Sequence, residues 1–202
     1  MTRIVNIGEA LIDEITRPNS EPVEVVGGSM LNVAAGLTRL GHESELATWF
    51  ARDARGDKVR AHAEAAGVTL TPGSDGAEFT TVAHAAVDEK GHATYEFDLS
   101  WDVPAVEDPD TVGHVHTGSY VVVVEPGADK VLAAVKRQAI RGTVSYDPNI
   151  RPALLGTPDE ARPHIEAIVA LADVVKASDE DLEWLYPGRP VEDVIREWSQ
   201  SG

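Results

Sequence analysis

Two glycines and two polar side chains in the first part of the sequence suit a ligand that carries many hydroxyl groups. Asp13 follows the first apolar run, residues 4–7, and Gly27 and Gly28 stand before a helical pattern in which Asn32 lies one turn further on. A carboxylate accepts hydrogen bonds, an amide donates and accepts, and the backbone N–H groups at a glycine-rich helix start are free to donate. This set predicts a polyhydroxylated ligand, although a glycine pair taken alone is more often a simple turn.

A second polar segment, residues 147–152 (DPNIRP), follows a later strand-like run. Its prolines restrict the turn, and Arg151 has the paired donors that hold a phosphate or a carboxylate. Residues 176–181 (KASDED) follow the next predicted strand. Because ligands of parallel α/β proteins bind beyond the carboxyl ends of the strands, both segments are candidates for a binding site. A surface loop with a solvated arginine explains segment 147–152 equally well.

Several other kinds of site are disfavoured. The sequence has no P-loop pattern, no G-x-G-x-x-G after its first strand and no G-x-S-x-G. It has no cysteine, so thiolate metal sites and cysteine nucleophiles are excluded. His114 and His116 share one face of a strand, but no further ligand cluster lies nearby, so we expect polar neighbours rather than a metal.

The charge balance and the apolar runs indicate which partners to expect. There are 17 Lys and Arg against 34 Asp and Glu, which gives a net charge of −17 and disfavours a nucleic-acid binder. No apolar run approaches the roughly 18 residues of a membrane helix, and the N-terminal residues do not resemble a signal peptide. We therefore expect a soluble, cytoplasmic protein.

The elements that position these residues alternate between strand and helix. Strands are expected at 4–7, 45–50, 68–70, 112–118, 120–124, 143–147 and 173–177. Helices are expected at 30–40, 57–66, 129–140, 158–171, 178–185 and 190–199, with Thr157 and Ser178 as caps. Such alternation predicts a single α/β domain over residues 1–202, with a mostly parallel sheet and helices on both faces.

Two extended runs in the middle, 79–87 and 92–99, are joined by the short polar loop 88–91. This pattern is typical of a hairpin and therefore of antiparallel strands. The stretch 14–26 reads as a turn between short extended pieces. We expect a small antiparallel sheet attached to the larger parallel one.

The ordered set of motifs resembles the ribokinase-like (PfkB) carbohydrate kinase family, and within it the bacterial fructokinases. The resemblance rests on residues 7–9 with Asp13, on 27–34 (GGSMLNVA) with 40–41, and on segments 97–102, 115–119, 147–152 and 175–182. It covers essentially the whole chain. The fold that it implies is a Rossmann-like α/β domain with a β lid formed by segments 14–26 and 79–99.

The resemblance also implies roles for particular residues. Sugar binding is expected from Asp13, Gly27, Gly28 and Asn32, with Tyr95 or Phe97 packing on the sugar from the lid. Asn149 and Arg151 match a loop near the transferred phosphate. Lys176, Ser178 and Asp181 match the stretch that faces ATP and its Mg²⁺, although the family often has Asn and Glu at the last two positions.

The family's second signature, a Gly-Ala-Gly-Asp segment that carries the catalytic base, does not occur in the sequence. We therefore expect the N-terminal part of an ATP-dependent sugar kinase, inactive by itself, with fructose or a related ketose or hexose as substrate. Two alternatives stay open: a non-catalytic sugar-binding or interaction module, and a nucleoside kinase of the same family. The lid is a candidate surface for a homodimer, because a small sheet with exposed edges invites pairing.

Overall fold

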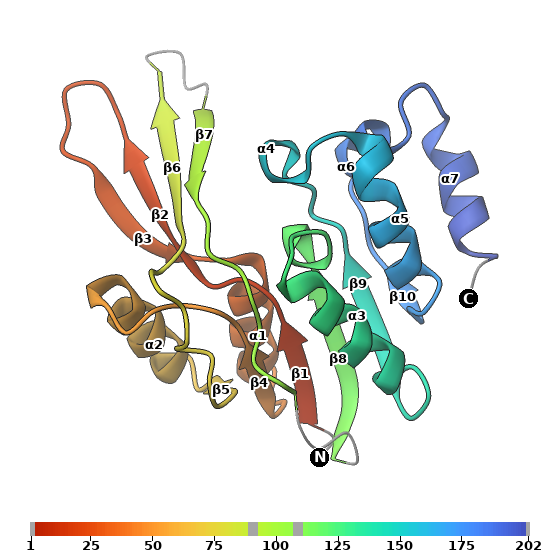
Figure 1. Cartoon of the computed structure of the whole chain (residues 1–202), viewed down its shortest axis with the longest axis horizontal. Helices are drawn as coiled ribbons and strands as arrows, with labels where there is room; N and C mark the ends of the chain where they lie inside the picture. Colours follow the sequence, from red (N-terminus) through yellow and green to blue (C-terminus); the bar gives the residue numbers. More distant parts are fainter. Residues whose placement is uncertain (1–2, 89–92, 107–110, 201–202) are drawn as a thin grey trace.

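The computed structural model describes residues 3–88, 93–106 and 111–200 of the chain (Figure 1). Its larger sheet has six strands in the order β10-β9-β8-β1-β4-β5, and every neighbouring pair is parallel. The strands are β1 (Arg3–Ile7), β4 (Ser44–Ala47), β5 (Thr69–Leu70), β8 (Val112–Gly118), β9 (Thr143–Asp147) and β10 (Val174–Val175). The predicted parallel sheet is confirmed.

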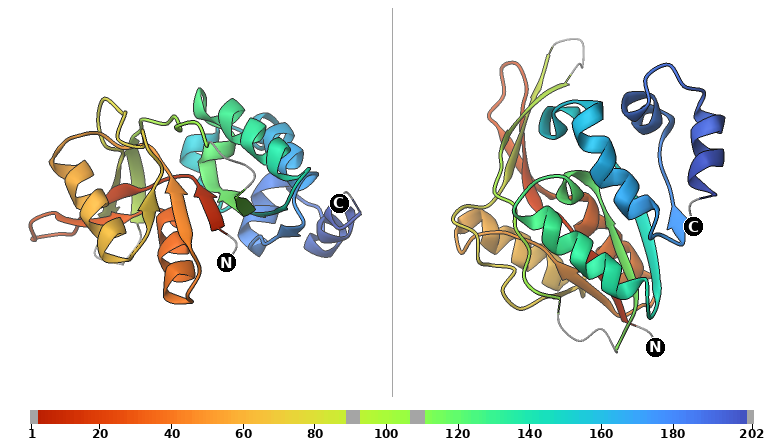
Figure 2. Two further views of the ribbon diagram at one scale, coloured as in Figure 1. Left: turned by 90° about the horizontal axis from the view of Figure 1, so that it is seen from below. Right: turned by 45° about the vertical axis from the view of Figure 1, so that its right-hand side comes forward.

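Helices cover both faces of this sheet. They are α1 (Ser29–Arg39), α2 (Ala54–Ala65), α3 (Gly127–Gln138), α4 (Pro152–Leu155), α5 (Pro158–Val169), α6 (Asp179–Leu185) and α7 (Val191–Trp198). The left view of Figure 2 shows α1 on one face of the sheet and α3 with α5 on the other. None of the helices in the described ranges is long and apolar enough to cross a membrane.

The smaller sheet, called the lid below, projects from one end of the larger sheet (Figure 1). Its strands are β3 (Val23–Gly27), β2 (Leu11–Thr16), β6 (Val82–Val87) and β7 (Ala93–Asp98), in the order β3-β2-β6-β7. The hairpin partners β6 and β7 are antiparallel, as predicted, but β2 and β6 are parallel. The expectation of an antiparallel lid is therefore wrong for this pair, since β2 and β6 are joined by a long crossover and not by a hairpin. The predicted loop 88–91 falls largely outside the described residues.

Local signals explain where several helices begin. Thr157 Oγ1 accepts from the backbone N–H of Glu160, whose side chain accepts from the backbone of Thr157, and Pro158 takes the first position of α5. Ser178 begins α6 with the same reciprocal arrangement. Both predicted caps are confirmed.

Two apolar clusters form the core. One lies on the central strands and includes Val5, Ile7 and Tyr146; the other includes Ile12, Met30 and the α2 residue Val59. The second cluster joins the base of the lid to α1 and α2, because Ile12 belongs to β2 and Met30 to α1. The burial of these apolar side chains holds the base of the lid against the rest of the domain.

One predicted element differs in the structure, and one helix was not predicted. Residues 120–124 do not form a strand: Ser119–Val122 is a 3₁₀ helix (η1), and all four of its side chains are buried. An apolar run is compatible with either element when it is buried on all sides, which explains the error. The helix α4 was not predicted, since it has only four residues and begins at Pro152, the last residue of segment 147–152.

Candidate functional site

A pocket of about 790 Å³ lies between the lid and the carboxyl ends of the central strands. Seven of the residues singled out from the sequence line it: Asp13, Gly28, Asn32, Tyr95, Phe97, Asn149 and Arg151. They come from β2, α1, β7 and the loop after β9, which are far apart in the chain. The fold therefore brings both polar segments to one cavity.

The strand register of the lid explains why Asp13 and the aromatic residues face the same way. Asp13 pairs with Ala83 of β6, and Ala83 pairs with Phe97 of β7, so the three side chains lie in one row on one face. Tyr95 is two residues from Phe97 and shares that face, and the two rings stack with centroids 6.4 Å apart. This inner face of the lid is turned toward the pocket.

Opposing influences act on the Asp13 carboxyl group. Its partial burial raises its pKa above 3.8, and the nearby positive charge of Arg151 counteracts this shift. Gly27 lies directly against this group, because a Cβ atom at Gly27 would stand 2.0 Å from Asp13 Oδ2. Gly27 does not line the pocket, but its lack of a side chain leaves room for the carboxylate.

Gly28 is required by the backbone. Its φ angle is +113°, and a Cβ atom there would lie 2.4 Å from the carbonyl oxygen of Glu9. The Gly28 carbonyl accepts from the Asn32 N–H at 3.1 Å, which starts α1 and sets Asn32 at the pocket. Only glycine fits this close approach at this backbone conformation.

Glu9 also lines the pocket, although its role was not predicted from the sequence. It is only 5% exposed, and its Oε1 accepts from Ser29 N at 3.0 Å and from Ser29 Oγ at 2.5 Å. Burial raises the pKa of its carboxyl group above 4.5, against the lowering effect of Ser29. Its position directly after the first strand could have indicated a site residue, because ligands bind beyond the carboxyl ends of parallel strands. Its contact with Ser29 could not be predicted, because it depends on the fold.

The loop after β9 forms the other side of the pocket. Asn149 has a φ angle of +38°, and its N–H donates to Asp147 Oδ1 at 3.2 Å. Arg151 Nη1 donates to the Ile150 carbonyl at 3.0 Å, and other donors of its guanidinium group remain for a ligand. Lys176 Nζ lies 3.1 Å from Asp147 Oδ2, so a second cation stands beside this loop.

The structure does not bring Lys176, Ser178 or Asp181 into the pocket. Lys176 lines a separate cavity of about 520 Å³ beside β10 and α7. Ser178 and Asp181 bond to each other at the start of α6, and Asp181 Oδ1 accepts from the Ile150 N–H at 2.7 Å. Asp181 thus holds the loop that carries Asn149 and Arg151, rather than facing the pocket.

The histidine pair on β8 has polar neighbours. His114 lies 2.7 Å from both Thr143 Oγ1 and Ser145 Oγ, and His116 lies 2.8 Å from Ser145 Oγ. Burial lowers the pKa of both rings. Within the described ranges, no group of three or more His, Cys, Asp or Glu residues is arranged to hold a metal ion.

The parallel sheet, the lid and the pocket between them define an α/β protein of the ribokinase-like type. The chain belongs to the pfkB family of carbohydrate kinases. The model of this family, described as "pfkB family carbohydrate kinase", matches residues 1–199.

Curated relatives with similar sequences are fructokinases. The fructokinase of Rhizobium leguminosarum bv. trifolii is 29% identical over 194 residues, which cover 90% of this chain and 59% of that protein. The fructokinase of Klebsiella pneumoniae is 30% identical over 189 residues, which cover 89% of this chain and 61% of that protein. The chain thus spans about 60% of the length of these curated relatives.

Solved structures show the same fold. The apo fructokinase of Vibrio cholerae O395 matches with a TM-score of 0.80 and 23% identity, over 100% of this chain and 72% of that one. The fructokinase of Xylella fastidiosa with bound ATP matches with a TM-score of 0.79 and 24% identity, over 98% of this chain and 65% of that one.

Proposed function

We propose that the chain is the sugar-binding portion of an ATP-dependent sugar kinase, with fructose or a related ketose or hexose as its substrate. The observation that carries this proposal is the meeting of Asp13, Asn32 and the Tyr95–Phe97 pair in one pocket under the lid. Asp13 and Asn32 supply acceptors and donors for hydroxyl groups. The aromatic rings supply a flat apolar surface for the C–H face of the sugar. The curated fructokinase relatives support the choice of fructose.

The donors opposite the lid fit the phosphate groups of ATP. Arg151 and Asn149 line the pocket, and Lys176, which lies outside it, pairs with the pocket residue Asp147. Cationic and amide groups at the carboxyl ends of parallel strands are suited to hold phosphate oxygens. ATP supplies the phosphoryl group for transfer, and Mg²⁺ neutralises part of its charge when bound. Ser178 and Asp181 already bond to each other, so we propose that they stabilise the loop after β9 and do not bind ATP themselves.

The lid contributes by covering the sugar. An enclosed sugar is protected from water, which otherwise competes for the phosphoryl group. A cytoplasmic location is part of this proposal, because the proposed reaction consumes ATP.

We also propose that two copies of the chain pair through their lids. Val23, Val25 and Tyr95 stand on the inner face of the lid and are 51%, 48% and 53% exposed. Such apolar exposure on one face favours contact with another protein surface. Light scattering of the purified chain tests this idea; a monomer at all concentrations contradicts it.

Isothermal titration calorimetry with the 202-residue chain tests the proposed function. D-fructose, D-ribose, 2-keto-3-deoxygluconate and adenosine are titrated separately. We expect heat of binding with a sugar and not with adenosine, and no sugar-dependent consumption of ATP, because the sequence has no Gly-Ala-Gly-Asp segment. Binding of adenosine alone favours the nucleoside kinase. Failure of all the sugars to bind contradicts the proposal.

A further inference from the structure

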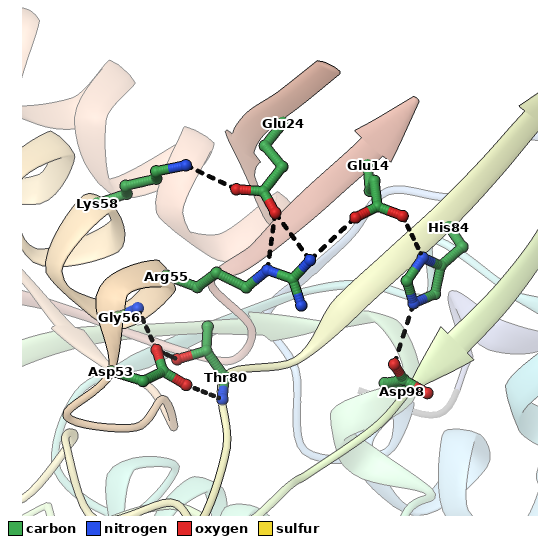
Figure 3. Close-up of polar contacts among 9 residues, drawn as sticks. All are labelled: Glu14, Glu24, Asp53, Arg55, Gly56, Lys58, Thr80, His84 and Asp98. Atoms are coloured by element: carbon green, nitrogen blue, oxygen red, sulfur yellow. Dashed lines mark hydrogen bonds and ion pairs between the residues drawn. The ribbon is translucent and has the colours of Figure 1, made fainter. Parts of the chain in front are cut away.

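The face of the lid opposite to Asp13 and Phe97 carries a cluster of charged side chains, which Figure 3 shows. We call it the outer-face network. Its members are Glu14 on β2, Glu24 on β3, Arg55 and Lys58 on α2, His84 on β6 and Asp98 on β7. All of them come from the lid strands or from the helix that packs against the lid.

One part of the network ties the lid to the body of the domain. Arg55 donates through Nε to Glu24 Oε1 at 2.8 Å and through Nη2 to Glu14 Oε2 at 2.9 Å. Lys58 Nζ donates to Glu24 Oε2 at 2.6 Å. Since α2 is packed into the core through Val59, these contacts hold β2 and β3 against a rigid helix.

The other part joins three lid strands through one histidine. His84 Nδ1 lies 2.9 Å from Glu14 Oε1, and His84 Nε2 lies 3.0 Å from Asp98 Oδ2 (Figure 3). An ionised carboxylate only accepts, so both ring nitrogens must donate, and only the doubly protonated imidazolium can do so. The same two carboxylates raise the pKa of His84 above 6.5, Asp98 contributing most.

The charges around His84 favour its protonated form. Glu14 faces it from β2, Asp98 faces it from β7, and Glu96 of β7 is its register partner. Arg55 reaches the same region from α2, but it is bonded to Glu14 and Glu24. Among the residues that the structure describes, these acidic groups therefore outnumber the neighbouring cation Arg55.

The register links this cluster to the pocket on the other face. Glu14 directly follows Asp13 on β2, and Asp98 directly follows Phe97 on β7. Successive side chains of a strand point to opposite faces, so a bond to Glu14 or Asp98 also fixes the backbone that carries Asp13 or Phe97. The contacts of His84 thus join the strands of the pocket's carboxylate and of its aromatic wall.

We propose that His84 is a positioning residue for the ligand pocket, and that loss of its proton weakens ligand binding by releasing β2 or β7. This inference rests on the proposed function, because it requires a sugar to bind between Asp13 and Phe97. A neutral imidazole carries one N–H, so one of the two contacts must break when the proton leaves. The affinity is then highest below pH 6.5 and falls as the pH rises through the raised pKa of His84.

Calorimetric titration of the 202-residue chain with D-fructose between pH 5.5 and pH 8.5 tests the inference. For the unmodified protein we expect the affinity to fall by about 3- to 10-fold across this range, which is the effect of one hydrogen bond. His84→Gln is expected to have the weaker affinity already at pH 5.5 and to lose most of the pH dependence. His164→Gln is the matched control, because His164 is exposed on α5 and does not line the pocket.

Asp98→Asn provides a second variant, in case His84→Gln does not fold. It removes the carboxylate that raises the pKa of His84 most, so the fall in affinity should move to a lower pH. Thermal unfolding of each variant shows that the fold is retained. If the unmodified protein binds fructose and the His84→Gln and Asp98→Asn variants keep its pH profile, the inference is wrong and the proposed function stands. If the unmodified protein binds no sugar at any pH, the proposed function fails and the inference fails with it.

Discussion

Replacing Gly28 by alanine should destabilise the protein and remove ligand binding together. The φ angle of Gly28 is +113°, and an alanine held there costs about 1–3 kcal/mol in backbone strain. The new Cβ atom would stand 2.4 Å from Glu9 O and 2.8 Å from Ala10 Cα. Both are backbone atoms of the segment between β1 and β2 and cannot rotate away, which adds a packing cost of about 1–3 kcal/mol.

The chain offers a matched control in the same helix. Gly36 lies inside α1, and a Cβ atom there would have no heavy atom within 4 Å. Gly36→Ala therefore gains the helix propensity of alanine, about 1 kcal/mol, without a clash. The same chemical change is thus expected to have opposite effects on stability at the N-cap of α1 and inside the helix.

Thermal unfolding followed by circular dichroism measures both changes. For a chain of this size, about 1 kcal/mol shifts the midpoint by roughly 2–4 °C. We expect Gly28→Ala, at a combined cost of about 2–6 kcal/mol, to lower the midpoint by roughly 4–24 °C, and Gly36→Ala to raise it by roughly 2–4 °C. Equal midpoints for the two variants would refute the argument that the approach of Gly28 to Glu9 holds the start of α1.

Three further predictions concern single groups. Asp13→Asn should weaken fructose binding by roughly 10-fold or more, because a charged acceptor is lost from a partly buried site; unchanged affinity in calorimetry excludes this role. The pKa of Glu9 is raised above 4.5, so the free energy of unfolding should fall as the pH rises from 4.5 through the raised pKa. Glu9→Gln should lack this loss when unfolding by urea is measured at several pH values. If the free energies of unfolding of the variant and of the unmodified protein change with pH in the same way, the argument is wrong. Thr157→Ala removes the cap of α5 and should cost about 1 kcal/mol in thermal unfolding. The fructose affinity of this variant should not change, because α5 does not line the pocket. A weakened affinity would contradict the claim that the cap affects stability alone.

Much of the local structure could be predicted because its causes are local. The capping pair of Thr157 and Glu160 lies within four residues, and the helical pattern after Gly28 repeats every turn. The hairpin of β6 and β7 was predicted from a polar loop between two extended runs. The run at residues 120–124 was wrongly predicted because burial from all sides removes any periodic pattern.

The site could be predicted only in part. Asp13, Asn32 and Arg151 were selected by residue type and by their places in the ordered motifs, and all three line one pocket. Asp181 was selected in the same way, but its carboxylate bonds to the Ile150 N–H and to Ser178. Such a partner cannot be read from residue type, because it depends on how β9 and α6 meet.

By itself the sequence determined most of the helices and strands, and which ligand chemistry its polar segments can serve. These properties follow from residue types and from spacings of a few residues. The tertiary structure alone decided that Glu9 bonds to Ser29, and that His84 links the strands of Asp13 and Phe97 on the outer face of the lid. Both depend on pairings between segments tens of residues apart, and only chain crossovers and strand register set such pairings.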